Sequence, residues 1–363
     1  MSTSSPLHDV HAALGASFTD FAGWSMPLRY GSELAEHRAV REAAGLFDLS
    51  HMGEIELTGP EAGRALDYAL VGNLSGLKVG RARYTMICDA AGGVLDDLVV
   101  YRLGEDHFMV VANASNSDLV AGELRSRAEG FTVEVDDRSR NCALVACQGP
   151  RSAGIIGRVC DADLDTLTYY GSVPTRVAGH DVLLARTGYT GEDGFEVFAQ
   201  AEHATDVWAA LTGAGEADGL LPAGLAARDT LRLEAGMPLY GNELSADMSP
   251  FDAGLGRVVK FDKAADFVGR AALEERAKNP ADHKRVGLTS EGRRAPRHGY
   301  PVLDGDTPVG TVTSGALSPT LGHPIAMAYV PPALTEPGTA LFVDVRGKAQ
   351  PVEVVKLPFY KRA

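Results

Sequence analysis

The sequence predicts an α+β protein that ends in a separate all-β unit. Three observations support this prediction. Segments with helical periodicity alternate with strand-like segments, the strands occur in pairs of hairpin length, and helix signals stop beyond about Lys284. Because short turns force neighbouring strands to run antiparallel, we expect antiparallel sheets before that point and a small closed, barrel-like β unit after it.

Five helices are expected, within residues 31–45, 58–72, 143–159, 202–215 and 222–236. In the first, Ser32 is available as the N-cap and Gly45 as the stop. In the second, Pro60 lies at the start, where proline is tolerated. Pro222 is expected to open the last helix for the same reason.

Two strand groups precede the all-β end. Residues 83–113 form a meander of three strands joined by two short turns. Residues 181–200 form a strand, a glycine-rich loop and a second strand. The glycine spacing in that loop, Gly188, Gly191 and Gly194, fits neither a dinucleotide-binding fingerprint nor a phosphate-binding P-loop, so neither kind of site is expected.

The composition excludes several functions. The chain has 363 residues, which is long enough for two or three cores. Its composition, 45% hydrophobic and 23% charged, is typical of a globular protein. A net charge of −14 argues against nonspecific binding to nucleic acid or anionic membranes, since phosphates require clustered cations. The basic segment 283–298 is the local exception, and is either a solvated surface or a contact for an anionic partner.

The chain shows no signal for secretion, membrane insertion or metal binding. The N-terminus lacks a basic flank followed by an apolar core, and no uncharged apolar run approaches the roughly 20 residues of a membrane span. The four cysteines are scattered and show no CxxC spacing. We therefore expect a cytoplasmic protein without a metal site.

Two adjacent acids, Asp96 and Asp97, interrupt the second strand of the meander, GGVLDDLVVY. Successive side chains of a strand point to opposite faces, so Asp97 shares a face with Tyr101 whereas Asp96 shares the other with Leu98 and Val100. Both faces are mostly apolar. A buried carboxylate costs several kcal/mol unless it is paired or hydrogen-bonded, so at least one of these acids requires partners.

Turn geometry supplies candidate partners for these acids. A first turn centred near Ala91 pairs residue 84 with residue 98, and a second turn centred between residues 105 and 106 pairs residue 98 with residue 113. Tyr84 and Asn113 then flank the two acids, within one residue of register. The arrangement is either a polar ligand pocket or a purely structural set of hydrogen bonds to Asp97.

Glu196 and Arg228 are further charged residues with mostly apolar neighbours. Glu196 could accept two parallel N–H donors from a planar heterocycle, or form a structural ion pair with Arg186 or Arg228. Arg228 lies on an apolar helical stripe, which favours a carboxylate from another segment or from a ligand. His51 has no companion ligand at metal spacing, so it is expected to be a core or surface histidine.

These segments together resemble a known family, the T-protein of the glycine cleavage system, an aminomethyltransferase. The resemblance extends in order from about Leu7 to Tyr360, through the motifs DFAGWSMPLRY, FDLSHMGE, GGVLDDLVVY, VVANASN, QGPRSA, RTGYTGEDGFEVF, PAGLAARDTLRLEAGMPLYGNEL, GTVTSGALSPTLGHPIAMAYV and LPFYKR. One departure is Met237, where some relatives have tyrosine.

The resemblance implies a fold and a set of site residues. The fold is a three-domain, cloverleaf-like α+β arrangement, with residues 1–54 plus 137–240, 55–136 plus about 241–275, and 284–363 as its domains. The resemblance makes Asp97 the critical catalytic residue. The folate contacts of the family correspond to Tyr84, Tyr101, Asn113, Tyr189, Glu196, Arg228 and Tyr360.

The resemblance also implies a reaction. The expected activity transfers an aminomethyl carbon from the lipoyl arm of the H-protein to the cosubstrate tetrahydrofolate, releasing ammonia and forming 5,10-methylenetetrahydrofolate. Two alternatives are a folate-dependent demethylase on the same scaffold and a non-catalytic folate-binding factor for iron–sulfur assembly. The second is disfavoured because the loop RTGYTGEDG lacks the cysteine of such factors.

Overall fold

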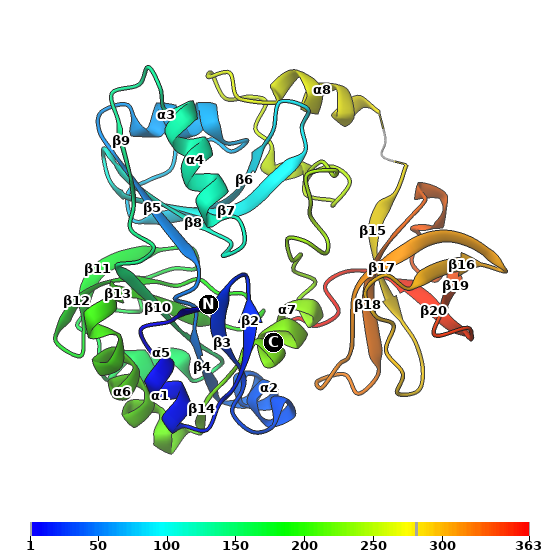
Figure 1. Cartoon of the computed structure of the whole chain (residues 1–363), viewed down its shortest axis with the longest axis horizontal. Coiled ribbons are helices and arrows are strands. Elements are labelled where there is room, and N and C mark those ends of the chain that lie inside the picture. Colours follow the sequence, from blue (N-terminus) through cyan, green and yellow to red (C-terminus); the bar gives the residue numbers. More distant parts are fainter. Residues whose placement is uncertain (1, 280–281, 363) are drawn as a thin grey trace. The chain divides into compact units, whose positions relative to one another are not determined.

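The computed structural model describes residues 2–279 and 282–362, which form two compact units (Figure 1). The first unit combines the described residues up to Ile87 with Asp96–Arg228 and Asp262–Phe267. The second combines Cys88–Leu95, Asp229–Phe261 and the described residues from Val268 onward. The chain therefore passes from one unit to the other several times.

The largest sheet of the first unit has six strands in the order β11-β12-β13-β10-β4-β14. Their bounds are β4 Ala44–Asp48, β10 Cys142–Gln148, β11 Ser172–Val177, β12 His180–Ala185, β13 Gly194–Gln200 and β14 Leu220–Pro222. Helices α5 (Ser152–Gly157) and α6 (Ala204–Gly215) pack on this sheet. Val145, Phe195 and Trp208 are among the residues of the shared core, so apolar burial fixes where β13 lies.

A second sheet has five strands in the order β6-β7-β8-β5-β9. Their bounds are β5 Gly53–Thr58, β6 Arg81–Cys88, β7 Val94–Gly104, β8 His107–Ala112 and β9 Glu134–Asp137. Helices α3 (Ala62–Ala69) and α4 (Ser117–Arg127) lie together on one side of this sheet (Figure 1). The meander expected over residues 83–113 is confirmed as β6, β7 and β8.

The N-terminal part of the first unit forms a small three-stranded sheet with two helices. The strands are β1 Thr3–Ser4, β2 Ser17–Phe21 and β3 Trp24–Arg29, in the order β1-β3-β2. The helices are α1 (His8–Ala13) and α2 (Glu33–Glu42). The side chain of Ser32 accepts a hydrogen bond from the backbone of Ala35 at 3.4 Å, so Ser32 is the N-cap of α2 as predicted.

The second unit contains a closed barrel in the order β15-β18-β17-β16-β19-β20. Its strands are β15 Lys284–Thr289, β16 Pro301–Asp304, β17 Thr307–Leu317, β18 Pro324–Val330, β19 Ala340–Asp344 and β20 Ala349–Val355. Pairing of Gly287 with Val355 closes the barrel around a core rich in valine. Helix α8 (Arg270–Lys278) precedes it.

The predicted fold class is confirmed: the chain is α+β, with several mainly antiparallel sheets and a closed C-terminal barrel. Among the strands of the described residues, two pairs run parallel, β1 with β3 and β14 with β4. The division into three domains stays a prediction. Within the residues that the structure describes, no helix is long and apolar enough to cross a membrane.

Gly45 does not stop a helix, contrary to the prediction. Helix α2 ends at Glu42, and Gly45 lies inside β4. A Cβ atom at Gly45 would meet Cγ2 of the buried Val40 at 2.4 Å, so the glycine permits α2 and β4 to pack closely.

Pro222 does not open a helix either. It ends β14, paired with Leu46, and helix α7 spans Leu225–Glu234. The backbone between them is constrained at Gly224, whose N–H donates to the Glu36 carboxylate at 3.0 Å. A Cβ atom at Gly224 would lie 2.3 Å from the carbonyl oxygen of Leu28. The chain therefore turns tightly at this glycine before the helix begins.

The packing role of Gly45 makes a testable prediction. Gly45→Ala should lower the free energy of unfolding by about 1–3 kcal/mol, because the added methyl group overpacks the stiff side chain of Val40. Gly122→Ala is the matched control, since Gly122 lies exposed in α4 with no atom near the position of its absent Cβ. That change should instead stabilise the protein by up to about 1 kcal/mol. Urea unfolding measures both, and equal stability changes would contradict the packing role.

Candidate active site

The two acids of β7 point to opposite faces of the strand. Asp96 is fully buried and shares its face with the buried Leu98 and Val100. Asp97 is half-buried on the other face, with Tyr101. This is the alternation that the period of a strand predicts. The two carboxylates therefore have different surroundings although they are neighbours in the chain.

Asn113 lies beside Asp97, one residue from the predicted register. Strands β7 and β8 pair Val99 with Val111, and continuing this register brings Asn113 level with Asp97. The predicted pairing of residues 98 and 113 is therefore wrong by one. The cause is a bulge between Arg102 and Gly104, which adds a residue to β7 next to the turn.

Asp96 accepts hydrogen bonds from two asparagines. Its Oδ2 accepts from the backbone N–H of Asn113 at 3.0 Å. Its Oδ1 accepts from the side-chain nitrogens of Asn113 at 2.8 Å and Asn116 at 2.7 Å. Asn116 is the N-cap residue of α4, yet its side chain makes no capping bond and instead donates a hydrogen bond to Asp96. The buried acid is thus anchored to the start of a helix.

Asp97 is bound by Tyr84 and Asn113, the two residues that the turn geometry selected. The Tyr84 hydroxyl donates to Oδ2 at 2.9 Å, and Nδ2 of Asn113 donates to Oδ1 at 2.8 Å. The same Nδ2 atom also binds Asp96, so one amide nitrogen bridges both carboxylates. The relative position of the two acids is fixed by this shared donor.

The two acids differ in how burial and charge act on them. Burial, followed by the nearby charge of Asp97, raises the pKa of Asp96 to about 7 against the opposing hydrogen bonds from Asn113 and Asn116. Burial also raises the pKa of Asp97, whereas the hydrogen bonds from Tyr84 and Asn113 lower it. Since two adjacent carboxylates resist joint ionisation, we assign the charge at neutral pH first to Asp97.

Glu196, on β13, is held by Thr187 and Tyr101. The Thr187 hydroxyl donates to Oε2 of Glu196, and the Tyr101 hydroxyl donates to the same oxygen at 3.3 Å. Tyr101 is fully buried, so burial followed by the charge of Glu196 raises its pKa and keeps the phenol protonated. Arg186, one of the two predicted ion-pair partners, instead binds Asp193 at 2.6 Å.

Arg228 stacks on Tyr189. Its guanidinium carbon lies 4.7 Å from the centre of the Tyr189 ring, a cation–π distance. Burial lowers the pKa of Arg228, and the charges of Tyr189 and Glu196 oppose that shift. Arg228 thus lies within electrostatic reach of Glu196, and both are available to a ligand that presents N–H donors and an anionic group.

His51 is a core histidine, one of the two outcomes expected for it. It is 2% exposed, and its ring meets that of Phe21 edge-on at 5.3 Å. Burial, followed by the charge of Arg228, lowers the pKa of His51 to about 4, so the ring is neutral at physiological pH.

Three residues near the site were not found from sequence: Asn116, Thr187 and Glu54. All three lie inside quoted motifs, but their surroundings depend on side chains of other elements. Glu54, on β5, is 1% exposed, and within the described chain neither of its carboxyl oxygens has a hydrogen-bond partner. Burial, then the charges of Asp137 and Glu196, raise the pKa of Glu54 well above its ordinary range.

Tyr360 belongs to the second unit, whereas the other predicted site residues belong to the first. It is half-buried, and its backbone N–H donates to the carbonyl oxygen of Glu234 at 2.8 Å.

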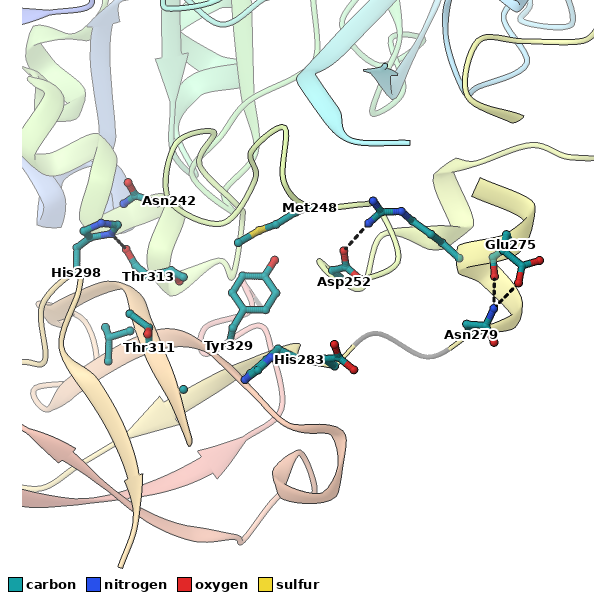
Figure 2. A pocket seen from close by; sticks show the side chains of 14 residues that line it. Asn242, Met248, Asp252, Glu275, Asn279, His283, His298, Thr311, Thr313 and Tyr329 are labelled. Atoms are coloured by element: carbon teal, nitrogen blue, oxygen red, sulfur yellow. Dashed lines mark hydrogen bonds and ion pairs between the residues drawn. The ribbon is translucent and has the colours of Figure 1, made fainter. Parts of the chain in front are cut away.

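The second unit also contains a cavity of about 710 Å³ (Figure 2). Its lining includes Tyr329 and the histidines at the two ends of the basic segment, His283 and His298.

The fold and the site define an α+β protein with a C-terminal barrel, in which two sheets of one unit present carboxylates and phenols and the start of α7 presents an arginine. Comparisons with known proteins give the family. A model of the GCVT N-terminal domain matches residues 7–263, and a model of the glycine cleavage T-protein C-terminal barrel domain matches residues 283–361. The chain belongs to the glycine cleavage T-protein family.

Individual relatives agree with this assignment. An aminomethyltransferase of Saccharopolyspora erythraea is 62% identical over 358 residues, which cover 98% of each chain. One of Streptomyces coelicolor is 64% identical over 360 residues, covering 98% of this chain and 97% of the relative. The crystal structure of glycine cleavage system aminomethyltransferase T from Bartonella henselae matches with a TM-score of 0.94 at 38% identity, over 99% of both chains.

The buried Glu54 makes a prediction about stability and pH. Its pKa is higher in the folded than in the unfolded protein, so the unfolded state loses its proton first and is favoured as pH rises. Glu54→Gln should therefore be more stable than the parent protein at pH 8. The expected difference is about 1.4 kcal/mol for each pH unit between the pKa of Glu54 in the folded protein and its pKa in the unfolded protein. Near pH 4 the advantage should disappear. Urea unfolding at several pH values measures this, and an advantage independent of pH would contradict it.

Proposed function

We propose that this protein is a tetrahydrofolate-dependent aminomethyltransferase of the glycine cleavage system. It transfers the aminomethyl carbon from the lipoyl arm of the H-protein to tetrahydrofolate. The products are 5,10-methylenetetrahydrofolate, ammonia and the reduced lipoyl thiol. Family membership supports the reaction class, and the acid pair on β7 is the observation that supports the chemistry.

The overall reaction is balanced without an oxidant or reductant. The carbon gives up its bonds to the lipoyl sulfur and to the amino nitrogen, and forms bonds to N5 and N10 of tetrahydrofolate. These two folate nitrogens each lose a proton. One proton ends on the lipoyl sulfur and the other on the departing ammonia. The site must therefore stabilise positive charge on the carbon and N5 while they join, and move protons.

Asp97 is the residue suited to this task. Its carboxylate is oriented by Tyr84 and Asn113 before any ligand binds, and it lies where burial has removed much of the water. A preorganised carboxylate stabilises a developing cation more strongly in such a site than in water. The same group is also able to orient N5 or to accept the N10 proton during ring closure.

Glu196 and Arg228 are proposed to bind the folate substrate. A carboxylate only accepts hydrogen bonds, so Glu196 suits the N–H donors on the edge of the pterin ring. Arg228 suits an anionic group of the ligand. Tyr84, Tyr101, Asn113, Tyr189 and Tyr360 complete the proposed folate contacts. Tetrahydrofolate is a cosubstrate in this proposal and no metal takes part.

The proposed protein partner is the lipoylated H-protein. Lys284, Arg293 and Arg297 are exposed on the second unit, as electrostatic steering of a carrier would require.

Comparing the products formed with aminomethylated H-protein and with methyl donors distinguishes this activity from a demethylase. A protein that binds folate but forms neither product would be the non-catalytic binding factor.

The folate role of Glu196 is tested by Glu196→Ala. Losing hydrogen bonds to a charged group should weaken tetrahydrofolate binding by about 1.5–3 kcal/mol. Calorimetry measures the affinity, and Glu202→Ala, a change of an exposed glutamate outside the site, should leave it unaltered. Unchanged affinity in a folded Glu196→Ala protein would remove this residue from the pterin site.

The catalytic role of Asp97 is tested by replacing each acid of the pair with asparagine. Asp97→Asn keeps the shape but removes the charge, so it should cost roughly 3 kcal/mol of transition-state stabilisation, about 10²-fold in rate, with little change in folate affinity. Ammonia release and methylenetetrahydrofolate formation measure the rate.

Asp96→Asn is the matched control. It should leave the chemistry largely intact but lower stability by about 1–3 kcal/mol, because an asparagine at this position must turn an NH₂ group toward the donors of Asn113 or Asn116. Equal small losses of rate for the two variants, or a larger loss for Asp96→Asn, would mean that the charged catalytic group is not Asp97.

A further inference from the structure

Tyr170 lies in a short turn that joins the two large sheets of the first unit. Its backbone N–H donates to the carbonyl oxygen of Arg186, the residue after β12, at 3.0 Å. Its carbonyl oxygen accepts from the backbone N–H of Ala82, on β6, at 2.8 Å. Tyr170 is therefore fixed on one side by β6, the strand of Tyr84, and on the other by Arg186, which precedes Thr187.

The backbone of Tyr170 is strained. Its φ of 61° lies in the left-handed region, which residues with large side chains rarely adopt. Two arginines hold the turn in place: Arg81 donates to the carbonyl oxygen of Tyr169 at 3.0 Å, and Arg186 donates to that of Leu167 at 2.9 Å. Strain that is maintained by so many surrounding bonds occurs preferentially at functional sites.

The side chain of Tyr170 shares its surroundings with the site. It is half-buried, and within the described residues its hydroxyl makes no hydrogen bond. Burial, then the charges of Tyr169, Glu196 and Asp97, raise its pKa, so the phenol keeps its proton. Tyr170 in turn contributes to the raised pKa values of Tyr84 and Tyr101. A neutral phenol with an unused donor thus lies within electrostatic reach of both functional carboxylates.

The Tyr170 hydroxyl can donate a hydrogen bond, which the two ionised carboxylates cannot. Glu196 and Asp97 accept hydrogen bonds, so they bind N–H groups but not the acceptor atoms that alternate with N–H groups around a pterin. We infer that the Tyr170 hydroxyl donates a hydrogen bond to an acceptor atom of the folate substrate, and so acts as a specificity-determining residue beside Glu196. The inference rests on the proposed function. The backbone bonds hold Tyr170 in place before the ligand binds.

Tyr170→Phe removes the hydroxyl alone and tests the inference. Calorimetry should find the dissociation constant of tetrahydrofolate raised about 3- to 10-fold, the effect of one hydrogen bond. The KM for tetrahydrofolate should rise by a similar factor, with kcat at saturating folate within twofold of the parent value. Tyr169→Phe is the matched control: its ring is next in the chain but 49% exposed, so it should change neither constant.

A second variant separates binding from folding. Asparagine tolerates a positive φ, so Tyr170→Asn removes the phenol while relieving strain. Tyr170→Asn should weaken folate binding and leave the unfolding temperature unchanged or higher. If the tyrosine had a purely structural role, the variant would instead be less stable than the parent protein. Affinity within twofold of the parent in both Tyr170 variants would overturn the inference and leave the proposed function intact. A parent protein that does not bind tetrahydrofolate would overturn both.

Discussion

The site depends on one side-chain amide, that of Asn113, which donates to both carboxylates of a single strand. Adjacent acids on a strand point to opposite faces, and the common partner links their two carboxylates directly. The amide nitrogen of Asn113 lies 2.8 Å from an oxygen of each acid. Moving either carboxylate therefore disturbs the other. The charge of Asp97 also acts on Asp96 across this short separation.

The surrounding elements keep this arrangement rigid. β7 is an inner strand of its sheet, with β6 supplying Tyr84 and the end of β8 leading into Asn113. Glu196 comes from the other large sheet, where an apolar core on β13 fixes its strand. Functional groups on packed strands are positioned more accurately than groups on free loops. The turn at Tyr170 ties the two sheets together through backbone bonds on either side.

Much of the fold was predictable because it depends on local periodicity. The faces of Asp96 and Asp97 follow from the period of a strand, and the meander follows from its short turns. Gly45, Pro222 and the bulge before Gly104 were not predictable, since each depends on a contact with a distant segment or on how a turn closes. The partners of Asp97 could be selected from register alone. Asn116 and Glu54 could not, because their surroundings come from other strands and helices.

We infer that Asp97 holds the charge at neutral pH, and that this charge adds to burial in raising the pKa of Asp96. Carbon-13 NMR titration of the aspartate carboxyls, assigned with the two asparagine variants, measures this directly. The account predicts that Asp97 titrates below Asp96, that Asp96 titrates at about pH 7 in the parent protein, and that its pKa falls in Asp97→Asn. An Asp96 pKa that is the same in the parent protein and in Asp97→Asn would contradict the account.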